Sequence, residues 1–171
     1  MIEKEQTKQL PLLGIGPIYV ITCLIMTLSG LYLQWKGILS QGIIVHARVP
    51  LAVLGTLLVL LGMALWIYAV LIQKVGREIK ANHLVTYGVF SVVRNPIYSA
   101  FLFIFTGILF MAGNRHLLFL PVIFYVFLTL LLRETEEKWL KDMFGQEYVQ
   151  YCQKVNRVFP WWPRSTPSKN N

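Results

Sequence analysis

Two polar stretches interrupt a mostly apolar chain, and they hold the side chains whose types and spacing suggest chemistry. The first, HLVTYGVFSVVRNPIY at 83–98, contains Arg94-Asn95-Pro96 near its end. A polar residue followed by proline typically starts a helix. The unpaired N–H groups of such a start suit a carboxylate or another anion, and Arg94 adjoins them. In the alternative interpretation, Arg94 reaches out to lipid phosphates and Asn95 only caps the helix.

The second stretch contains two adjacent acidic residues, Glu136 and Glu137. Neighbouring residues on a helix point about 100° apart, so these carboxylates are expected to act on different atoms. A solvated helix face is the alternative, with the glutamates pairing with Arg133 and Lys141.

The composition of the chain indicates that the elements that position these two stretches lie in a membrane. The chain has 171 residues, of which 56% are hydrophobic and 14% charged, whereas soluble domains have about 25% charged residues. Crossing the hydrocarbon core takes roughly 20 apolar residues in a helix. Long uncharged runs predict two such spans, near Leu12–Leu33 and Val49–Ile72.

Two shorter uncharged runs predict a helical hairpin with arms at Tyr98–Ala112 and Leu117–Leu132. Its polar tip is the sequence Asn-Arg-His at 114–116, and Pro121 is expected to kink the second arm.

Beyond the hairpin, apolar residues recur at helical spacing from Arg133 to Val155. This pattern predicts an amphipathic helix that continues the fourth span and breaks near Gly145. Paired tryptophans, Trp161 and Trp162, suit the headgroup layer.

The predicted fold is therefore an all-α integral membrane protein with about four transmembrane helices, the last two a hairpin, and a cytoplasmic amphipathic C-terminal helix. It divides into a two-helix membrane segment at 1–72, a core with the polar loop, hairpin and C-terminal helix at 73–163, and a flexible tail at 164–171.

Basic residues are distributed unequally between the two ends of these spans. Thirteen of the 16 lysines and arginines fall at the end that holds both termini, and three, Lys36, Arg48 and Arg115, at the other. Because basic residues collect in cytoplasmic loops, both termini are expected in the cytoplasm, with the protein in the cell inner membrane. Anionic headgroups account for the net charge of +8 better than nucleic acid does. The positions of the two cysteines predict neither a disulfide nor a metal site.

The pattern L-V-T-x-G-x-F-x-x-x-R-N-P-x-Y from Leu84, followed by E-E-x-x-L-x-x-x-F-G-x-x-Y-x-x-Y from Glu136, closely resembles the isoprenylcysteine carboxyl methyltransferase family. That family is similar to the phospholipid N-methyltransferases. The resemblance covers 73–163 and implies an integral membrane enzyme that binds S-adenosyl-L-methionine without a Rossmann sheet. The chain contains no glycine-rich dinucleotide motif after a strand.

The resemblance implies the site residues by position. Those expected around the cofactor are His83, Leu84, Val85, Phe90, Arg94, Asn95, Pro96, Tyr98 and Glu136, and those expected near the acceptor, as catalytic residues, are Arg133 and Glu137. The chain departs from the family at four of its positions. Phe90 stands where tyrosine is frequent and Asn95 where histidine is frequent. The usual histidine position falls on Asn82, one before His83, and Arg133 lies three rather than four residues before Glu136.

Physical roles follow for several of these residues. Glu136 can hold ribose hydroxyls or the cofactor's ammonium, and the helix start can hold its carboxylate. Phe90 and Tyr98 can pack on adenine or face the sulfonium. A neutral amine or hydroxyl acceptor loses a proton, and Glu137 is then the candidate general base.

The expected function is a methyltransferase that acts at the cytoplasmic membrane face on a lipophilic acceptor. The acceptor is an isoprenylcysteine carboxylate or another isoprenoid or lipid nucleophile, through O, S or N. Phospholipid amine N-methylation and a non-catalytic membrane protein with a degenerate site are the main alternatives. A proton-coupled exporter lacks support because the spans hold no acidic residue, and a sterol-type reductase is disfavoured by the short chain.

Overall fold

The computed structural model describes residues 14–73 and 83–161. Within these ranges the chain is helical and contains no strand, as predicted. The helices are α1 (Gly16–Trp35), α2 (Arg48–Ile67, extended by a π-helical turn, Tyr68–Ile72), α4 (Pro96–Ala112), α5 (Leu120–Glu134) and α6 (Glu136–Lys154). The start of the first predicted span, Asn82, Trp162 and the predicted tail lie outside the described residues.

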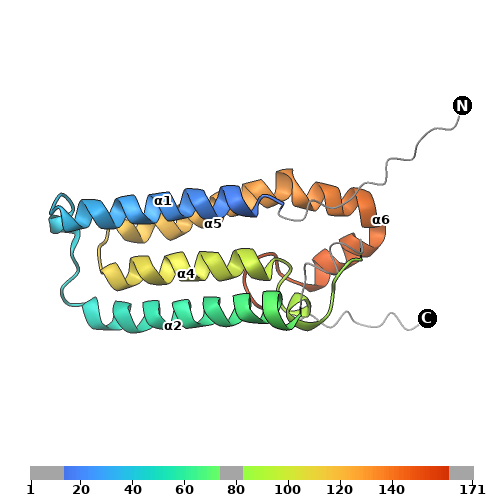
Figure 1. The fold of residues 1–171 in the computed structure, drawn as a ribbon, viewed down its shortest axis with the longest axis horizontal. Coiled ribbons are helices and arrows are strands. Elements are labelled where there is room, and N and C mark those ends of the chain that lie inside the picture. Colours follow the sequence, from blue (N-terminus) through green and yellow to red (C-terminus); the bar gives the residue numbers. More distant parts are fainter. Residues whose placement is uncertain (1–13, 74–82, 162–171) are drawn as a thin grey trace, which may run out of the picture.

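Four long helices lie side by side, and α6 lies across one end of them (Figure 1). Helix α4 is between α2 on one side and the α1–α5 pair on the other. Among the described residues, three helical segments are long and apolar enough to cross a membrane: Gly16–Trp35, Arg48–Ile72 and Leu117–Glu134. Helix α4 has 17 residues, at the short end of the range that spans a bilayer.

Helices α2 and α4 pack almost backbone to backbone, because glycines face each other across their contact. A Cβ added to Gly107 would lie 2.4 Å from the carbonyl oxygen of Gly55, and one added to Gly62 would lie 2.6 Å from the carbonyl oxygen of Ala100. Small residues allow this close approach in membrane proteins, where van der Waals packing stabilises helix pairs. Any larger side chain at these positions would force the helices apart.

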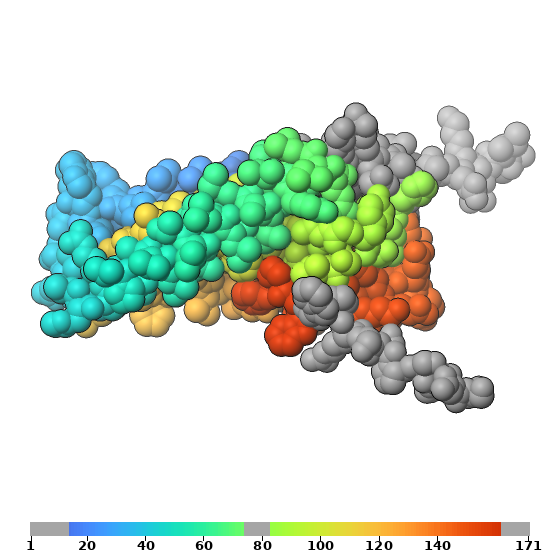
Figure 2. Space-filling model, turned by 90° about the horizontal axis from the view of Figure 1, so that it is seen from below, coloured from blue at the N-terminus to red at the C-terminus, as the bar shows by residue number. Residues whose placement is uncertain are grey.

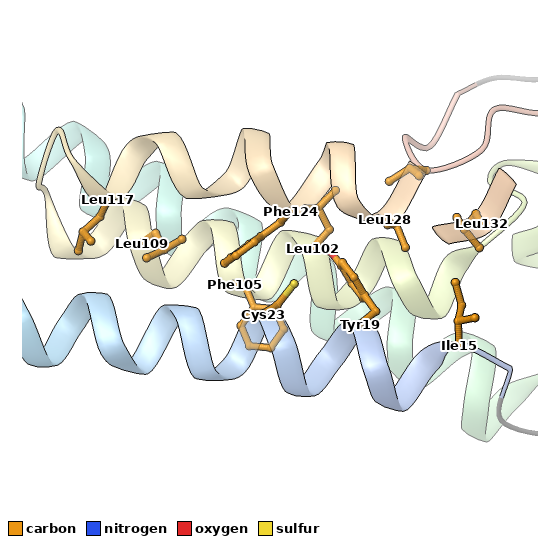
Figure 3. Packing of buried hydrophobic residues seen from close by; sticks show 11 residues of the cluster. Ile15, Tyr19, Cys23, Leu102, Phe105, Leu109, Leu117, Phe124, Leu128 and Leu132 are labelled. Atoms are coloured by element: carbon orange, nitrogen blue, oxygen red, sulfur yellow. The ribbon is translucent and has the colours of Figure 1, made fainter. Parts of the chain in front are cut away.

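The main hydrophobic core lies between α1, α4 and α5 (Figure 3). Its largest fully buried side chains include Tyr19 from α1, Leu109 from α4, and Phe124 and Leu128 from α5. These residues recur on one face of each helix and therefore hold the three helices together near the bundle axis.

The predicted hairpin between α4 and α5 is confirmed, and its tip is fixed to the α1–α2 loop. Asn114 is fully buried, and its side-chain amide donates to the Leu39 carbonyl oxygen at 2.8 Å. Helix α4 ends at Ala112 and is followed by Gly113, whose left-handed conformation at φ 60° is one that glycine adopts without steric cost. Pro121 lies in the first turn of α5, where its missing N–H removes no helical bond. The kink predicted at Pro121 therefore stays a prediction.

Helix α6 differs from the prediction at its start and agrees with it at Gly145. It does not continue α5 directly, because Thr135 breaks the helical path with φ −126° and ψ −84°. The predicted break near Gly145 is confirmed, with φ 53° and ψ −124° at that residue. The two breaks let α6 fold back over the end of the bundle (Figure 1).

Candidate active site

A cavity of about 460 Å³ lies at the end of the bundle where α6 crosses it. Small-molecule sites commonly have volumes of about 300–1,000 Å³. Its walls come from the start of α1, the loop that precedes α4, the start of α4, and α6. Every residue predicted to surround the cofactor lines this cavity: His83, Leu84, Val85, Phe90, Arg94, Asn95, Pro96, Tyr98 and Glu136.

Glu136 joins three separate elements within the cavity. Its Oε1 accepts a hydrogen bond from the Tyr98 hydroxyl of α4 and another from the Ile15 N–H at 3.0 Å. Its Oε2 accepts no hydrogen bond from the part of the chain that the structure describes. Burial raises the pKa of Glu136, while the hydrogen bonds from Tyr98 and Ile15 act in the opposite direction. Glu136 thus lines the cavity with one carboxylate oxygen that is unpaired among the described residues.

The start of α1 closes over this carboxylate, which requires a glycine at position 14. A Cβ on Gly14 would lie 2.0 Å from Glu136 Oε1 and 3.2 Å from the Tyr98 hydroxyl. The φ of Gly14 is +47°, a conformation that favours glycine. Sequence reasoning missed this contribution, because Ile15 and Glu136 are 121 residues apart.

The loop before α4 is held from both sides, which places Phe90 at the cavity wall. Gln73, after α2, accepts from the Val89 N–H at 3.1 Å and donates to the Tyr87 carbonyl oxygen at 2.8 Å. On the other side, the Tyr151 hydroxyl of α6 donates to the Phe90 carbonyl oxygen at 2.5 Å.

Arg94 is buried among protein groups and does not reach lipid phosphates. Its side chain is only 8% exposed, and Nη2 lies 3.3 Å from Glu137 Oε1. Nη1 donates to the Tyr148 hydroxyl at 3.3 Å and to Cys152 Sγ. Arg94 thus lines the cavity while it is anchored to α6.

Asn95 precedes α4 as predicted, but its side chain does not cap the helix. The amide instead donates to the Arg157 carbonyl oxygen at 3.0 Å. The capping role expected for Asn95 is therefore wrong, and the helix start is left without a side-chain acceptor from Asn95. Because Pro96 has no N–H, the Ile97 and Tyr98 amides are the first available donors of α4.

Neither residue predicted to be catalytic lines the cavity. Arg133 is exposed in the last turn of α5. Glu137 accepts two hydrogen bonds from Arg157, at 2.6 and 2.9 Å, in addition to its ion pair with Arg94. Two arginines therefore surround the Glu137 carboxylate.

Several lining residues were not predicted. From α6 they are Trp139, Leu140, Tyr148 and Tyr151, and from α1 and α4 they are Gly16, Pro17, Val20, Ile97 and Phe101. The α6 residues belong to the apolar positions of the amphipathic pattern, and that signal could have found them. Val20 and Phe101 lie about one turn inside their helices, so the cavity has an apolar end between α1 and α4.

This arrangement can bind a molecule that carries both charges and an apolar part. Glu136 Oε2 is an acceptor for a cationic group, and the start of α4 provides N–H groups for an anion. Aromatic rings of Phe90, Tyr148 and Tyr151 offer faces for a planar or cationic group.

Comparisons with known proteins show the family to which the chain belongs. Residues 51–147 match the family of phospholipid methyltransferases. Methanethiol S-methyltransferase 1 of Bradyrhizobium diazoefficiens is 39% identical over 88 residues, which cover 51% of this chain and 30% of that protein. Protein-S-isoprenylcysteine O-methyltransferase B of Arabidopsis thaliana is 33% identical over 94 residues, which cover 52% of this chain and 44% of that protein.

The matched part thus spans less than half the length of these curated relatives. No solved structure gives a significant match to the chain.

Proposed function

Because the chain belongs to the phospholipid methyltransferase family, we propose that it is an S-adenosylmethionine-dependent methyltransferase that binds its cofactor in the cavity at the α6 end of the bundle. One observation carries the proposal. The residues that the two sequence motifs assign to the cofactor come from segments far apart in the chain, and all of them line this one cavity.

The lining residues fit the chemical parts of this cofactor. The free Oε2 of Glu136 holds the ammonium, and the N–H groups at the start of α4 hold the carboxylate. Phe90, Tyr148 and Tyr151 pack against adenine or the sulfonium. The cofactor, when bound, supplies a methyl group that is already activated by its sulfonium. The protein therefore needs mainly to align the acceptor with that methyl group and to exclude water.

The acceptor is a lipophilic molecule that enters the apolar end of the cavity. Val20 and Phe101 form this end about one turn inside α1 and α4, and α1 has an exposed apolar face suited to lipid. The names of the relatives include isoprenylcysteine and methanethiol as acceptors. Both names describe a compound with a hydrocarbon group on sulfur, which supports an apolar acceptor pocket.

The cavity faces the cytoplasm in this proposal, with the protein in the inner membrane. Among the described residues, Lys36, Arg48 and Arg115 are at the end of the bundle away from α6, whereas the remaining basic residues are at the cavity end: Arg94, Arg133, Lys138, Lys141, Lys154 and Arg157. The rule that basic residues remain in the cytoplasm supports this orientation.

Phospholipid amine methylation is a second candidate, because the matching family is described by that reaction. Membranes that contain the protein can be incubated with methyl-labelled cofactor and then extracted. Label in phospholipid headgroups would support the second candidate, and label in isoprenoid or thiol products would support the first.

Binding of S-adenosylhomocysteine by purified protein in lipid nanodiscs tests the cofactor assignment. We expect saturable binding by calorimetry, and weaker binding by Tyr98→Phe, which removes the hydroxyl that orients Glu136. Tyr32→Phe is the matched control, because Tyr32 is 56% exposed in the turns of α1 farthest from the cavity. Absence of binding by folded wild-type protein would contradict the proposal.

A further inference from the structure

After α6, the chain runs back along the loop that lines the cavity. We call residues 156–161 the C-terminal strap. The Arg94 N–H donates to the Asn156 carbonyl oxygen at 2.9 Å, and the Trp161 N–H donates to the Val92 carbonyl oxygen at 3.0 Å. Figure 2 shows the red C-terminal residues against the yellow-green segment around residue 90. The strap thus pairs with the backbone of the cavity loop.

The strap is also fixed to the bundle. Val158 is 1% exposed and belongs to the main hydrophobic core. Its carbonyl oxygen accepts a hydrogen bond from the Ser99 hydroxyl at 2.5 Å. The Phe159 ring packs against Tyr125 of α5, with ring centroids 5.3 Å apart. The strap is therefore a packed part of the fold.

One ion pair ties the strap to α6. Arg157 forms the bidentate pair with Glu137, and the same carboxylate holds Arg94. The Glu137 side chain is 17% exposed and that of Arg157 is 26% exposed. A bidentate, partly buried pair has more geometric specificity than an exposed one.

We propose that Glu137 and Arg157 are positioning residues, which hold the C-terminal strap so that Arg94 and Asn95 keep the geometry that binds cofactor. This inference rests on the proposed function. It assigns Glu137 to the support of the cofactor site and gives it no part in proton transfer.

The geometry supports this role because Arg94 and Asn95 each take part in two sets of contacts. Both residues line the cavity. Both also bond to the strap, through the Arg94 N–H and the Asn95 side-chain amide. A site binds more tightly when its groups are held in place before the ligand arrives, since less ordering is then needed. Loss of the strap contacts should therefore lower cofactor affinity.

Arg157→Met tests this inference, with binding of S-adenosylhomocysteine measured by calorimetry in nanodiscs. We expect the dissociation constant to rise roughly tenfold, as for the loss of a charged hydrogen bond. Arg157→Lys should recover part of the affinity because it keeps the charge. The matched control is Lys138→Met, which removes the nearby but exposed ion pair with Glu134 and should leave affinity unchanged.

A second measurement needs no cofactor. Hydrogen exchange at the Arg94 amide, which bonds to Asn156, should become faster in Arg157→Met and remain unchanged in Lys138→Met. Asn156→Ala offers a milder change if Arg157→Met does not fold. It removes the Asn156 side-chain bonds to the Val158 and Phe159 N–H groups, both at 3.1 Å, and should weaken binding in the same direction.

The outcomes separate the two proposals. If wild-type protein does not bind S-adenosylhomocysteine, the proposed function fails and this inference fails with it. If wild-type protein binds and every folded strap variant binds equally well, only the positioning role is overturned. Unchanged cofactor affinity in Glu137→Gln, together with a large loss of turnover, would also overturn it, because that pattern indicates a general base.

Discussion

Replacing Glu136 by glutamine separates two roles of this side chain. In the free protein, Oε1 accepts hydrogen bonds from Tyr98 and Ile15, and an amide oxygen can accept both. In the proposed complex the carboxylate holds the cofactor's ammonium, and a neutral amide cannot replace a charge-assisted bond. We expect Glu136→Gln to fold normally and to bind cofactor weakly.

The expected size of the effect follows from that single lost interaction. A hydrogen bond to a charged group contributes about 1.5–3 kcal/mol, and about 1.4 kcal/mol corresponds to a tenfold change in affinity. The dissociation constant of S-adenosylhomocysteine should therefore rise roughly tenfold to a hundredfold. Calorimetry in nanodiscs measures it, and Glu147→Gln, an exposed position on the same helix, is the control.

The stability of the fold and the affinity for the cofactor should change in opposite directions as pH rises through the pKa of Glu136. Burial raises the pKa of Glu136 in the folded protein, so the folded state holds this proton more tightly than the unfolded chain does. The resulting stability is fully present below the unfolded-state pKa and is lost as pH rises through the folded-state pKa. Cofactor affinity should instead increase over the same rise in pH, because the ionised carboxylate binds the ammonium. Glu136→Gln should show neither change.

Two results would refute this reasoning. Unchanged affinity in Glu136→Gln would show that the carboxylate does not contact the cofactor. A glutamine variant that melts well below the wild type at neutral pH would show that the charge of Glu136 stabilises the fold, contrary to the burial described above.

Three further substitutions test other parts of the structure. Gly107→Ala, which would place a Cβ 2.4 Å from the Gly55 carbonyl oxygen, should destabilise the protein by about 1–3 kcal/mol, measured by thermal unfolding. Gly14→Ala would place a Cβ 2.0 Å from Glu136 Oε1 and should weaken binding of S-adenosylhomocysteine; full affinity would argue against closure of α1 over the site. Asn114→Ala loses a buried hydrogen bond and should cost about 1–3 kcal/mol of stability while cofactor affinity remains unchanged, because Asn114 is at the opposite end of the bundle.

The membrane helices could be predicted from the sequence because the hydrocarbon layer imposes a simple rule. A charge-free run of sufficient length predicts a helix that can cross the membrane, and the prediction at Val49–Ile72 differs by one residue from the helical segment Arg48–Ile72. The breaks were harder to predict. The helix break at Gly145 could be predicted because glycine adopts positive φ easily. Nothing in the residue type of Thr135 indicates that a helix stops there.

The residues that line the cavity could be predicted where local motifs name them, and the partners of those residues could not. Arg94 and Asn95 were interpreted through their nearest surroundings, the helix start that suits an anion or, in the alternative, the lipid headgroups. Their actual partners follow far along the chain, since Asn95 bonds to a residue 62 positions away. The contact of Ile15 with Glu136 spans most of the sequence. Such pairings are set by packing of the whole bundle, so no short window of sequence contains them.

The C-terminal strap has a consequence for biosynthesis. Residues 156–161 follow every long helix of the bundle in the sequence, and domains form in the order in which the ribosome delivers their parts. Membrane insertion of the long helices can therefore be complete while the loop at Arg94 still lacks its partner. In the proposed function, a nascent chain held at the translocon would bind the cofactor less tightly until translation has passed Trp161.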